Sequence, residues 1–177
     1  MSKKQVMAEI IRHTSLSDGI FDMTLKAEEI AKEAKAGQFI SVYLNNKSKI
    51  LPRPISICGI DKEAGTLRIV YRTVGDGTKE LSDYKEGEMV KILGPLGNGF
   101  TQKDKKAILI GGGIGIPPML ELAKSIKAAG TCEFVSVMGY RDAQTFLLDE
   151  FKEQVKKLKK EKSRLNSLDH HKINILN

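Results

Sequence analysis

The stretch LPRPISI, residues Leu51–Ile57, is the point from which the fold of this chain can be worked out. Pro52 and Pro54 each fix φ, remove a backbone donor and push the preceding residue into an extended conformation. Arg53 is therefore expected on extended backbone, where its guanidinium could hold a phosphate or carboxylate through two hydrogen bonds. Ser56 adds a small donor and acceptor on the strand face of Pro54. Taken alone, the motif is also explained by a surface arginine on a proline-stiffened edge strand.

Short β-prone segments separated by turn signals surround this stretch on both sides. Strands are expected at Val6–His13, Ile20–Leu25, Gln38–Leu44, Pro54–Gly59, Leu67–Val74 and Glu88–Leu93. The segments SLSDG and GPLGNGF are typical of turns, and the Ala- and Glu-rich segment before Gly37 is either a loop or one short helix. Six antiparallel strands in residues 1–100 predict a small closed barrel, because closure removes exposed strand edges.

The segment VGDGTKELSDY, between the fifth and sixth expected strands, combines glycines with a helix start. Gly75 and Gly77 allow close approach of the backbone to another group. Thr78 is expected to cap a short helix at Lys79–Tyr84. A helix N-terminus that follows glycines suits an anion. A plain capped connector between two strands is the alternative interpretation.

After residue 100 the hydrophobic period changes to that of an α/β unit. Ala107–Ile110 is a short apolar run that predicts a buried strand, and a helix with Met119 on its apolar face is expected to end at Gly130. A second strand, Glu133–Met138, and a second helix from Ala143 or Gln144 follow. Strand, glycine loop, helix and strand in this order predict a βαβ unit with a parallel pair of strands.

The glycine loop GGGIG, residues 111–115, does not match the G-x-G-x-x-G pattern, because Ile116 occupies the third glycine position. It still feeds a helix N-terminus, as phosphate-binding loops do. Gly111, Gly112, Gly113 and Gly115 could therefore receive a nucleotide cofactor. Tight packing of the strand against the helix also selects glycine, so this alternative stays open.

Composition narrows the classes of function. The net charge is +7, but residues 152–177 hold eight basic and three acidic residues, so the positive charge belongs to the C-terminal region rather than to a nucleic-acid-binding face. No apolar run approaches the ~20 residues of a membrane span, and the N-terminus lacks the apolar part of a secretory signal. Cys58 and Cys132 show no metal-type spacing. A cytoplasmic chain with reduced thiols, without nucleic-acid or membrane partners, is expected.

Several motifs occur in one order: RPIS at 53–56, VYR at 70–72, GT at 77–78, GPLGNGF and GGGIGIPP. Over residues 5–151 this order resembles the ferredoxin reductase-like flavoproteins, and within them the electron-transfer subunits of type B dihydroorotate dehydrogenases. The resemblance implies an FAD-binding β-barrel at 1–100, followed by a partial parallel-sheet NAD-binding α/β domain at 101–160. It also implies electron transfer from NAD(P)H through FAD to a catalytic dihydroorotate dehydrogenase subunit in pyrimidine biosynthesis.

The same resemblance implies which residues bind the cofactors. Those expected at the flavin and its pyrophosphate are Arg53, Pro54, Ile55, Ser56, Val70, Tyr71, Arg72, Gly77 and Thr78. Those expected at the nicotinamide nucleotide are Gly111, Gly112, Gly113 and Gly115. The chain needs no catalytic acid, base or nucleophile for this role, because the cofactors carry the chemistry.

The resemblance stops after Phe151. Such subunits continue with a cysteine cluster for a [2Fe–2S] centre, which takes four thiolates, and this chain has two cysteines. The chain is therefore expected to be a C-terminally shortened form with impaired electron transfer. Residues 161–177 are expected to be a basic, disordered tail, although an apolar face that includes Val155, Leu158 and Leu165 leaves a docking helix open. An FAD-binding module without turnover, serving assembly, is the alternative function.

Overall fold

The structure is a computed structural model that describes residues 3–46, 48–103, 106–130, 133–154 and 172–176. It divides into two compact units, residues 1–100 and 101–177. The first unit contains β1 (Lys4–Ser17), β2 (Ile20–Lys26), α1 (Glu28–Glu33), β3 (Phe39–Tyr43), β4 (Arg53–Asp61), β5 (Thr66–Arg72), α2 (Asp76–Ser82) and β6 (Met89–Leu96).

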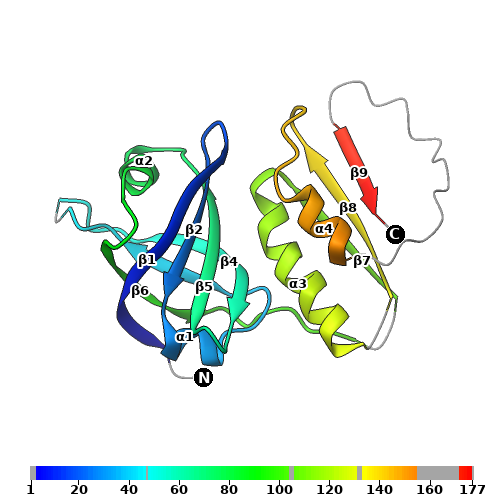
Figure 1. The fold of residues 1–177 in the computed structure, drawn as a ribbon, viewed down its shortest axis with the longest axis horizontal. Coiled ribbons are helices and arrows are strands. Elements are labelled where there is room, and N and C mark those ends of the chain that lie inside the picture. The colour runs from blue at the N-terminus through cyan, green and yellow to red at the C-terminus, as the bar shows by residue number, and fades with distance from the viewer. Residues whose placement is uncertain (1–2, 47, 104–105, 131–132, 155–171, 177) are drawn as a thin grey trace. The chain divides into compact units, whose positions relative to one another are not determined.

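The six strands of the first unit form a closed antiparallel barrel in the order β1-β2-β5-β4-β3-β6, which confirms the predicted barrel (Figure 1). The first strand, β1, closes it because it serves two neighbours. Its first half, from Lys4 to Glu9, pairs with β6, and its second half pairs with β2. A register shift between Ile10 and Arg12 marks the change of partner. Such irregularities bend a strand, which allows β1 to curve around the barrel.

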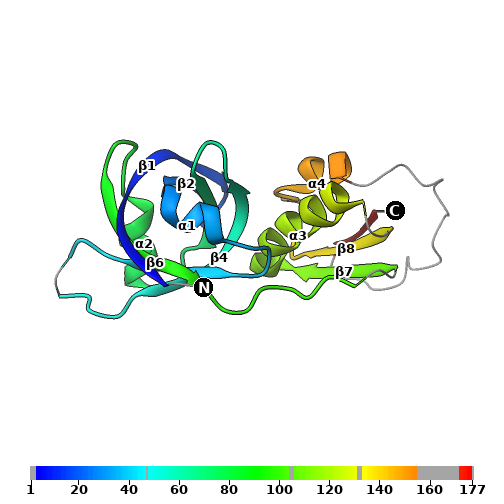
Figure 2. The same cartoon turned by 90° about the horizontal axis from the view of Figure 1, so that it is seen from below.

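The barrel interior is filled by the strand residues that alternation turns inward. Met23, Leu25 and Ile69 are fully buried there, and burying each such side chain contributes about 1.5–3 kcal/mol. Helices lie at opposite ends of the barrel (Figures 1 and 2). Helix α1 inserts Ile30 at one end, and α2 inserts Leu81 at the other. Helix α2 is therefore anchored by its buried face, and its first turn lies near the start of β4.

The second unit is smaller. Its elements are β7 (Ala107–Gly112), a 3₁₀ turn (Gly113–Gly115), α3 (Ile116–Ala129), β8 (Phe134–Tyr140), α4 (Leu148–Gln154) and β9 (Lys172–Leu176). Strands β7 and β8 are parallel, as predicted, and β9 pairs antiparallel with β8. Helix α3 ends at Gly130 in the left-handed conformation with φ 62°, which confirms that predicted helix end.

One face of the β7-β8-β9 sheet is uncovered within the described residues. Helices α3 and α4 both lie on the other face (Figure 2). Leu109 and Met138 are buried, but Ile108 and Ile110 are 70% and 71% exposed. The parallel register places Ile108 beside Val135 and Ile110 beside Val137, so the exposed face is apolar across both strands. The run Ala107–Ile110, predicted as a buried strand, is therefore buried on one face only.

Three further element boundaries differ clearly from those predicted. β1 continues to Ser17, so SLSDG is mostly strand, and only Asp18 and Gly19 make the turn. β6 continues to Leu96, so the first part of GPLGNGF is also strand. In both places backbone pairing within the barrel overrides local turn chemistry. Helix α4 begins at Leu148 rather than at 143 or 144.

The predicted tail is also corrected in part. Residues 172–176 form β9. Its pairing with β8 gives the backbone N–H and C=O groups of this segment hydrogen-bond partners. The rest of residues 161–177, together with Val155, Leu158 and Leu165, lies outside the described residues. In the described part of the chain, no helix has the length and apolarity to cross a membrane.

Candidate functional site

Arg53 is the first residue of β4 and lies on extended backbone, as the flanking prolines predict. Strand β4 is not an edge strand, because β3 and β5 pair with it on either side. The guanidinium is half-buried and donates a hydrogen bond from Nη1 to the carbonyl oxygen of Leu51. This bond holds the side chain back toward its own loop, at the end of the barrel that α2 covers.

Gly77, in the first turn of α2, explains how close this arginine comes to the helix. A Cβ atom added at Gly77 would clash with atoms of the Arg53 guanidinium. The absence of a side chain at Gly77 therefore forms the space in which Arg53 lies. A fixed cation is thereby placed beside a helix start, where the first N–H groups lack intrahelical partners and the dipole favours an anion.

Thr78 has a different role from the predicted one. It was expected to cap a helix at Lys79–Tyr84, but α2 begins at Asp76, Gly75 is its N-cap, and Thr78 is the third helical residue. Its hydroxyl oxygen accepts hydrogen bonds from the N–H groups of Val74 at 2.8 Å and Gly75 at 3.3 Å, and it donates to the Gly75 carbonyl. This back-bonding starts the helix one turn earlier than predicted and fixes the loop that enters it.

The other residues of the RPIS motif divide between the two faces of β4. Ile55 is buried in the barrel core, whereas Pro54 is exposed and Ser56 is half-buried on the outer face. Pro54 and Ser56 can therefore present side-chain atoms to a cofactor on the barrel wall. Ile55 can contribute only its backbone, because its side chain packs inside the barrel.

The VYR motif ends β5 beside β2. Val70 and Tyr71 are both 2% exposed, and Arg72 is half-buried. The Tyr71 hydroxyl lies 2.9 Å from Nε2 of His13. Burial raises the pKa of Tyr71 well above its usual range, with a smaller contribution from the charge of Asp83. Tyr71 is thus a neutral phenol held inside the unit, and Arg72 is the member of this motif whose side chain reaches solvent.

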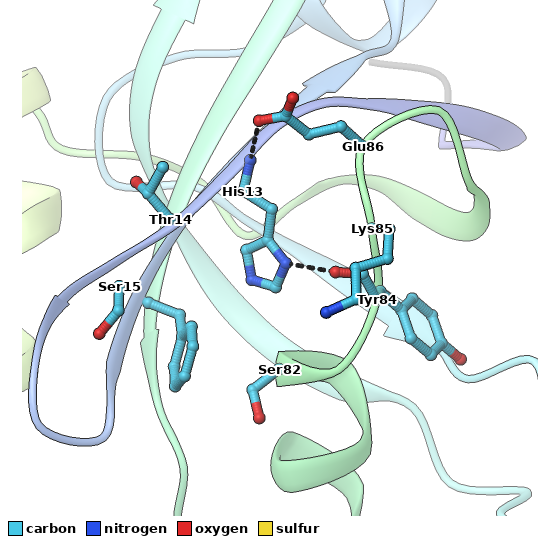
Figure 3. A pocket seen from close by; sticks show the side chains of 8 residues that line it. His13, Thr14, Ser15, Ser82, Tyr84, Lys85 and Glu86 are labelled. Atoms are coloured by element: carbon cyan, nitrogen blue, oxygen red, sulfur yellow. Dashed lines mark hydrogen bonds between the residues drawn. The ribbon is translucent and has the colours of Figure 1, made fainter.

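His13 lines a cavity of about 460 Å³, which Figure 3 shows between β1 and the segment after α2. Its Nδ1 lies 2.8 Å from the carbonyl oxygen of Tyr84, and its backbone N–H donates to Glu86. A carbonyl only accepts, so Nδ1 donates to Tyr84, and Nε2 forms a hydrogen bond with the Tyr71 hydroxyl. Both ring nitrogens are therefore engaged, one with Tyr84 and one with Tyr71, and the ring lies tilted against Phe21 at 46°.

Sequence reasoning missed a second contact of α2, with the loop that precedes β4. Lys49 Nζ lies 2.9 Å from a carboxylate oxygen of Glu80 and donates to the carbonyl of Asp76 at 3.1 Å. The hydrogen bond from Lys49 holds the pKa of Glu80 below its usual value. These residues are 31 positions apart and belong to no local motif, so only the pairing of elements brings them together.

The glycine loop lies in the second unit, between β7 and α3. A Cβ on Gly111 would come within 3.1 Å of the Ile116 Cα, and Gly113 has φ 52°, so packing and backbone conformation explain these two glycines. Gly112 and Gly115 have nothing within 4 Å of the position of a Cβ. The open side of the loop is therefore at Gly112 and Gly115, before the first turn of α3.

The arrangement of charge in the first unit suits a phosphate-bearing group. A guanidinium held over the first turn of α2 suits a diphosphate, and the exposed Pro54 and the hydroxyl of Ser56 adjoin it on the outer face of β4. In the described residues, no group of three or more metal-ligating side chains is found. The Arg53 guanidinium beside α2 and the Ser56 hydroxyl fit an organic cofactor with an anionic linker, as in FAD.

Comparison with known proteins agrees with this geometry. Residues 7–100 match the family described as the oxidoreductase FAD-binding domain. The electron transfer subunits of dihydroorotate dehydrogenase B (NAD⁺) from Streptococcus mutans and a Geobacillus strain are 41% and 36% identical to the chain. The matched regions cover 80% and 85% of this chain. The chain spans only 55% and 60% of the length of these relatives.

Solved structures show the same architecture. A structure of an NADH-dependent reduced ferredoxin–NADP oxidoreductase superposes with a TM-score of 0.76 at 33% identity. The match covers 84% of this chain and 54% of the chain in that structure. Phthalate dioxygenase reductase superposes with a TM-score of 0.73 at 24% identity, which shows the fold alone; the match covers 93% of this chain and 55% of that one. The chain therefore belongs to the oxidoreductase FAD-binding domain family and is a homologue of the electron-transfer subunit of dihydroorotate dehydrogenase B.

Proposed function

We propose that this chain holds FAD in its barrel unit and passes electrons from NAD(P)H to a partner dihydroorotate dehydrogenase in the cytoplasm. Homology supports an electron-transfer flavoprotein role. One observation carries the cofactor assignment. The Arg53 guanidinium occupies the space that Gly77 leaves at the first turn of α2, where an anion is stabilised by both the charge and the helix.

Each residue of this site has a stated task in the proposal. Arg53 binds a phosphate oxygen through charge-assisted hydrogen bonds, and Thr78 keeps the α2 entry loop in place beside it. Pro54 and Ser56 orient the flavin on the outer face of β4. When bound, FAD supplies the redox chemistry, since it accepts two electrons as a hydride and releases them one at a time. The protein contributes position, charge and exclusion of water.

The electron donor is assigned to the second unit. Gly112 and Gly115 leave the start of α3 open to a phosphate, which supports a nicotinamide nucleotide at this loop. The electron acceptor is proposed from the relatives, whose names identify them as subunits of dihydroorotate dehydrogenase B. We expect the catalytic subunit to co-purify with this chain under gentle conditions.

A second candidate function is an FAD-binding module without turnover that serves assembly. The observation that favours it is the uncovered apolar face at Ile108 and Ile110, because a nucleotide-binding sheet is normally covered on both faces. Both candidates need the flavin. They differ in whether NADH reduces it.

The first experiment is an FAD titration of the wild-type chain and of Arg53→Ala. Losing a hydrogen bond to a charged group costs about 1.5–3 kcal/mol, so the Kd for FAD should rise roughly ten- to a hundredfold. Arg141→Ala is the matched control, because Arg141 is an exposed arginine of the second unit. Equal FAD affinity of the wild type and Arg53→Ala would show that the assignment is wrong.

A further inference from the structure

We propose that Lys49 and Glu80 form a positioning clamp that keeps Arg53 over the first turn of α2. This inference rests on the proposed FAD site and deepens it. The two residues would not touch the cofactor. They would determine its affinity by holding the loop before β4 against the helix, so that the guanidinium is already in place when the cofactor arrives.

The contacts of the loop describe the clamp. Lys49 bridges two groups of α2, the Glu80 carboxylate at 2.9 Å and the Asp76 carbonyl at 3.1 Å. The side chains of Lys49 and Glu80 are 27% and 21% exposed, so the pair is largely shielded from water. Asn46 Nδ2 lies 3.5 Å from the same carboxylate oxygen as Lys49. The Glu80 carboxylate and the Asp76 carbonyl therefore both hold the loop to the helix.

The Tyr84 hydroxyl makes a second contact between the loop and the α2 region, next to the Lys49–Glu80 ion pair. The Tyr84 hydroxyl accepts a hydrogen bond of 2.6 Å from the backbone N–H of Asn45 and lies 3.5 Å from the other oxygen of Glu80. The loop thus contacts one oxygen of Glu80 directly, and the other oxygen only through Tyr84. The loop ends at Leu51, whose carbonyl accepts the hydrogen bond from Arg53. Movement of the loop away from α2 would carry this carbonyl, and with it the arginine side chain, away from Gly77.

The geometry also separates a clamp from a direct phosphate ligand. Lys49 Nζ is already engaged by a carboxylate and a carbonyl, so its charge is balanced within the protein. A direct ligand would bind phosphate better without Glu80, because the ammonium would then be unpaired. A clamp would bind phosphate worse without either partner. The two roles therefore predict opposite effects of removing the Glu80 charge.

The test compares Lys49→Gln, Glu80→Gln and the wild type in titrations with FAD and with riboflavin, which lacks the diphosphate. Partly exposed ion pairs contribute up to about 1 kcal/mol, so we expect the Kd for FAD to rise about two- to fivefold in both variants. Riboflavin affinity should not change, whereas general damage to the barrel would lower it as well. Lys49→Arg, which keeps the positive charge, should bind FAD as the wild type does, unlike Lys49→Gln.

Lys79→Gln is the matched control, since it removes the same charge from an exposed position of α2. Tighter FAD binding by Glu80→Gln, or unchanged FAD binding by both variants, would overturn the clamp while leaving the FAD site standing. Equal losses for FAD and riboflavin would also overturn it. A wild-type chain that does not bind FAD would contradict the proposed function and this inference together.

Discussion

At the scale of single residues, the site depends on one missing side chain. Gly77 has an ordinary helical conformation, so its backbone does not require glycine. What favours glycine is the Arg53 guanidinium, which lies too close to the position of a Cβ for one to fit without displacing it. Arg53 and Gly77 thus belong to one arrangement, although they are 24 positions apart in the sequence.

Gly77→Ala is therefore expected to weaken FAD binding about as much as Arg53→Ala does, although alanine favours a helix by about 0.5–1 kcal/mol. The Cβ would expel the guanidinium from its place on α2. The measurement is the Kd for FAD, taken with far-ultraviolet circular dichroism to confirm that the fold is kept.

The double variant provides the control for this prediction. Once Arg53 is alanine, Gly77→Ala has nothing to expel and should leave FAD affinity unchanged, which is the non-additivity expected of residues in contact. Additive losses would show that Gly77 is needed for some other reason, such as direct approach of the cofactor to the backbone.

At the scale of elements, the β7-β8-β9 sheet has two unlike faces. Leu109, which faces the helices, is 2% exposed, and its neighbour Ile110 is 71% exposed. A continuous run of apolar residues on one strand thus has a buried half and an exposed half. Exposed apolar surface on an unpaired sheet favours association between chains.

Two lysine variants of neighbouring residues test this difference. Ile110→Lys should keep the fold, lower the binding of a hydrophobic dye and reduce light scattering by concentrated protein. Leu109→Lys should unfold the second unit, because a charge placed against α3 has no partner and costs several kcal/mol. If Ile110→Lys also unfolds the unit, the face is covered in solution.

The same sheet shows why sequence reasoning succeeded in part. Alternation at Met23 and Leu25 and the glycine after α3 are local signals, and they predicted the barrel strands and the end of that helix. The pairing of β9 with β8 and the exposure of Ile108 depend on which segments meet, which local pattern does not record.

The candidate site divides in the same way. The extended backbone of Arg53 was predictable from the two prolines. Thr78, in contrast, was predicted to be the helix N-cap but is the third residue of the helix. His13, Lys49 and Glu80 carried no motif at all. Each acts across the barrel end on a residue more than 25 positions away, so their roles appear only in the folded unit.

At the scale of the whole molecule, we expect the purified chain to be yellow with FAD but to lack iron, because it has two cysteines and a [2Fe–2S] centre takes four thiolates. We also expect NADH to reduce its flavin slowly, or only at high concentration, because one face of the sheet beside the Gly111–Gly115 loop is uncovered among the residues that the structure describes. The measurement is the loss of flavin absorbance after mixing with NADH, together with an iron assay.

Dithionite is the control for this prediction, since full bleaching by it would show that the bound flavin is redox-competent. Rapid stoichiometric bleaching by micromolar NADH would contradict impaired transfer and exclude the module without turnover. Iron and sulfide in the purified protein would contradict the expected lack of a cluster.

The way in which β1 closes the barrel has a consequence for synthesis on the ribosome. Lys4 lies opposite Gly94 and Glu9 opposite Met89, so the first strand to emerge meets its second neighbour only after the last barrel strand has been translated. Contacts of such long sequence separation form slowly. Until then the first half of β1 has an open edge, and the nascent chain is at its most vulnerable to proteases and to pairing with other nascent chains. Translation of residues 89–96 thus allows β6 to pair with the first half of β1, and this pairing protects the N-terminal strand.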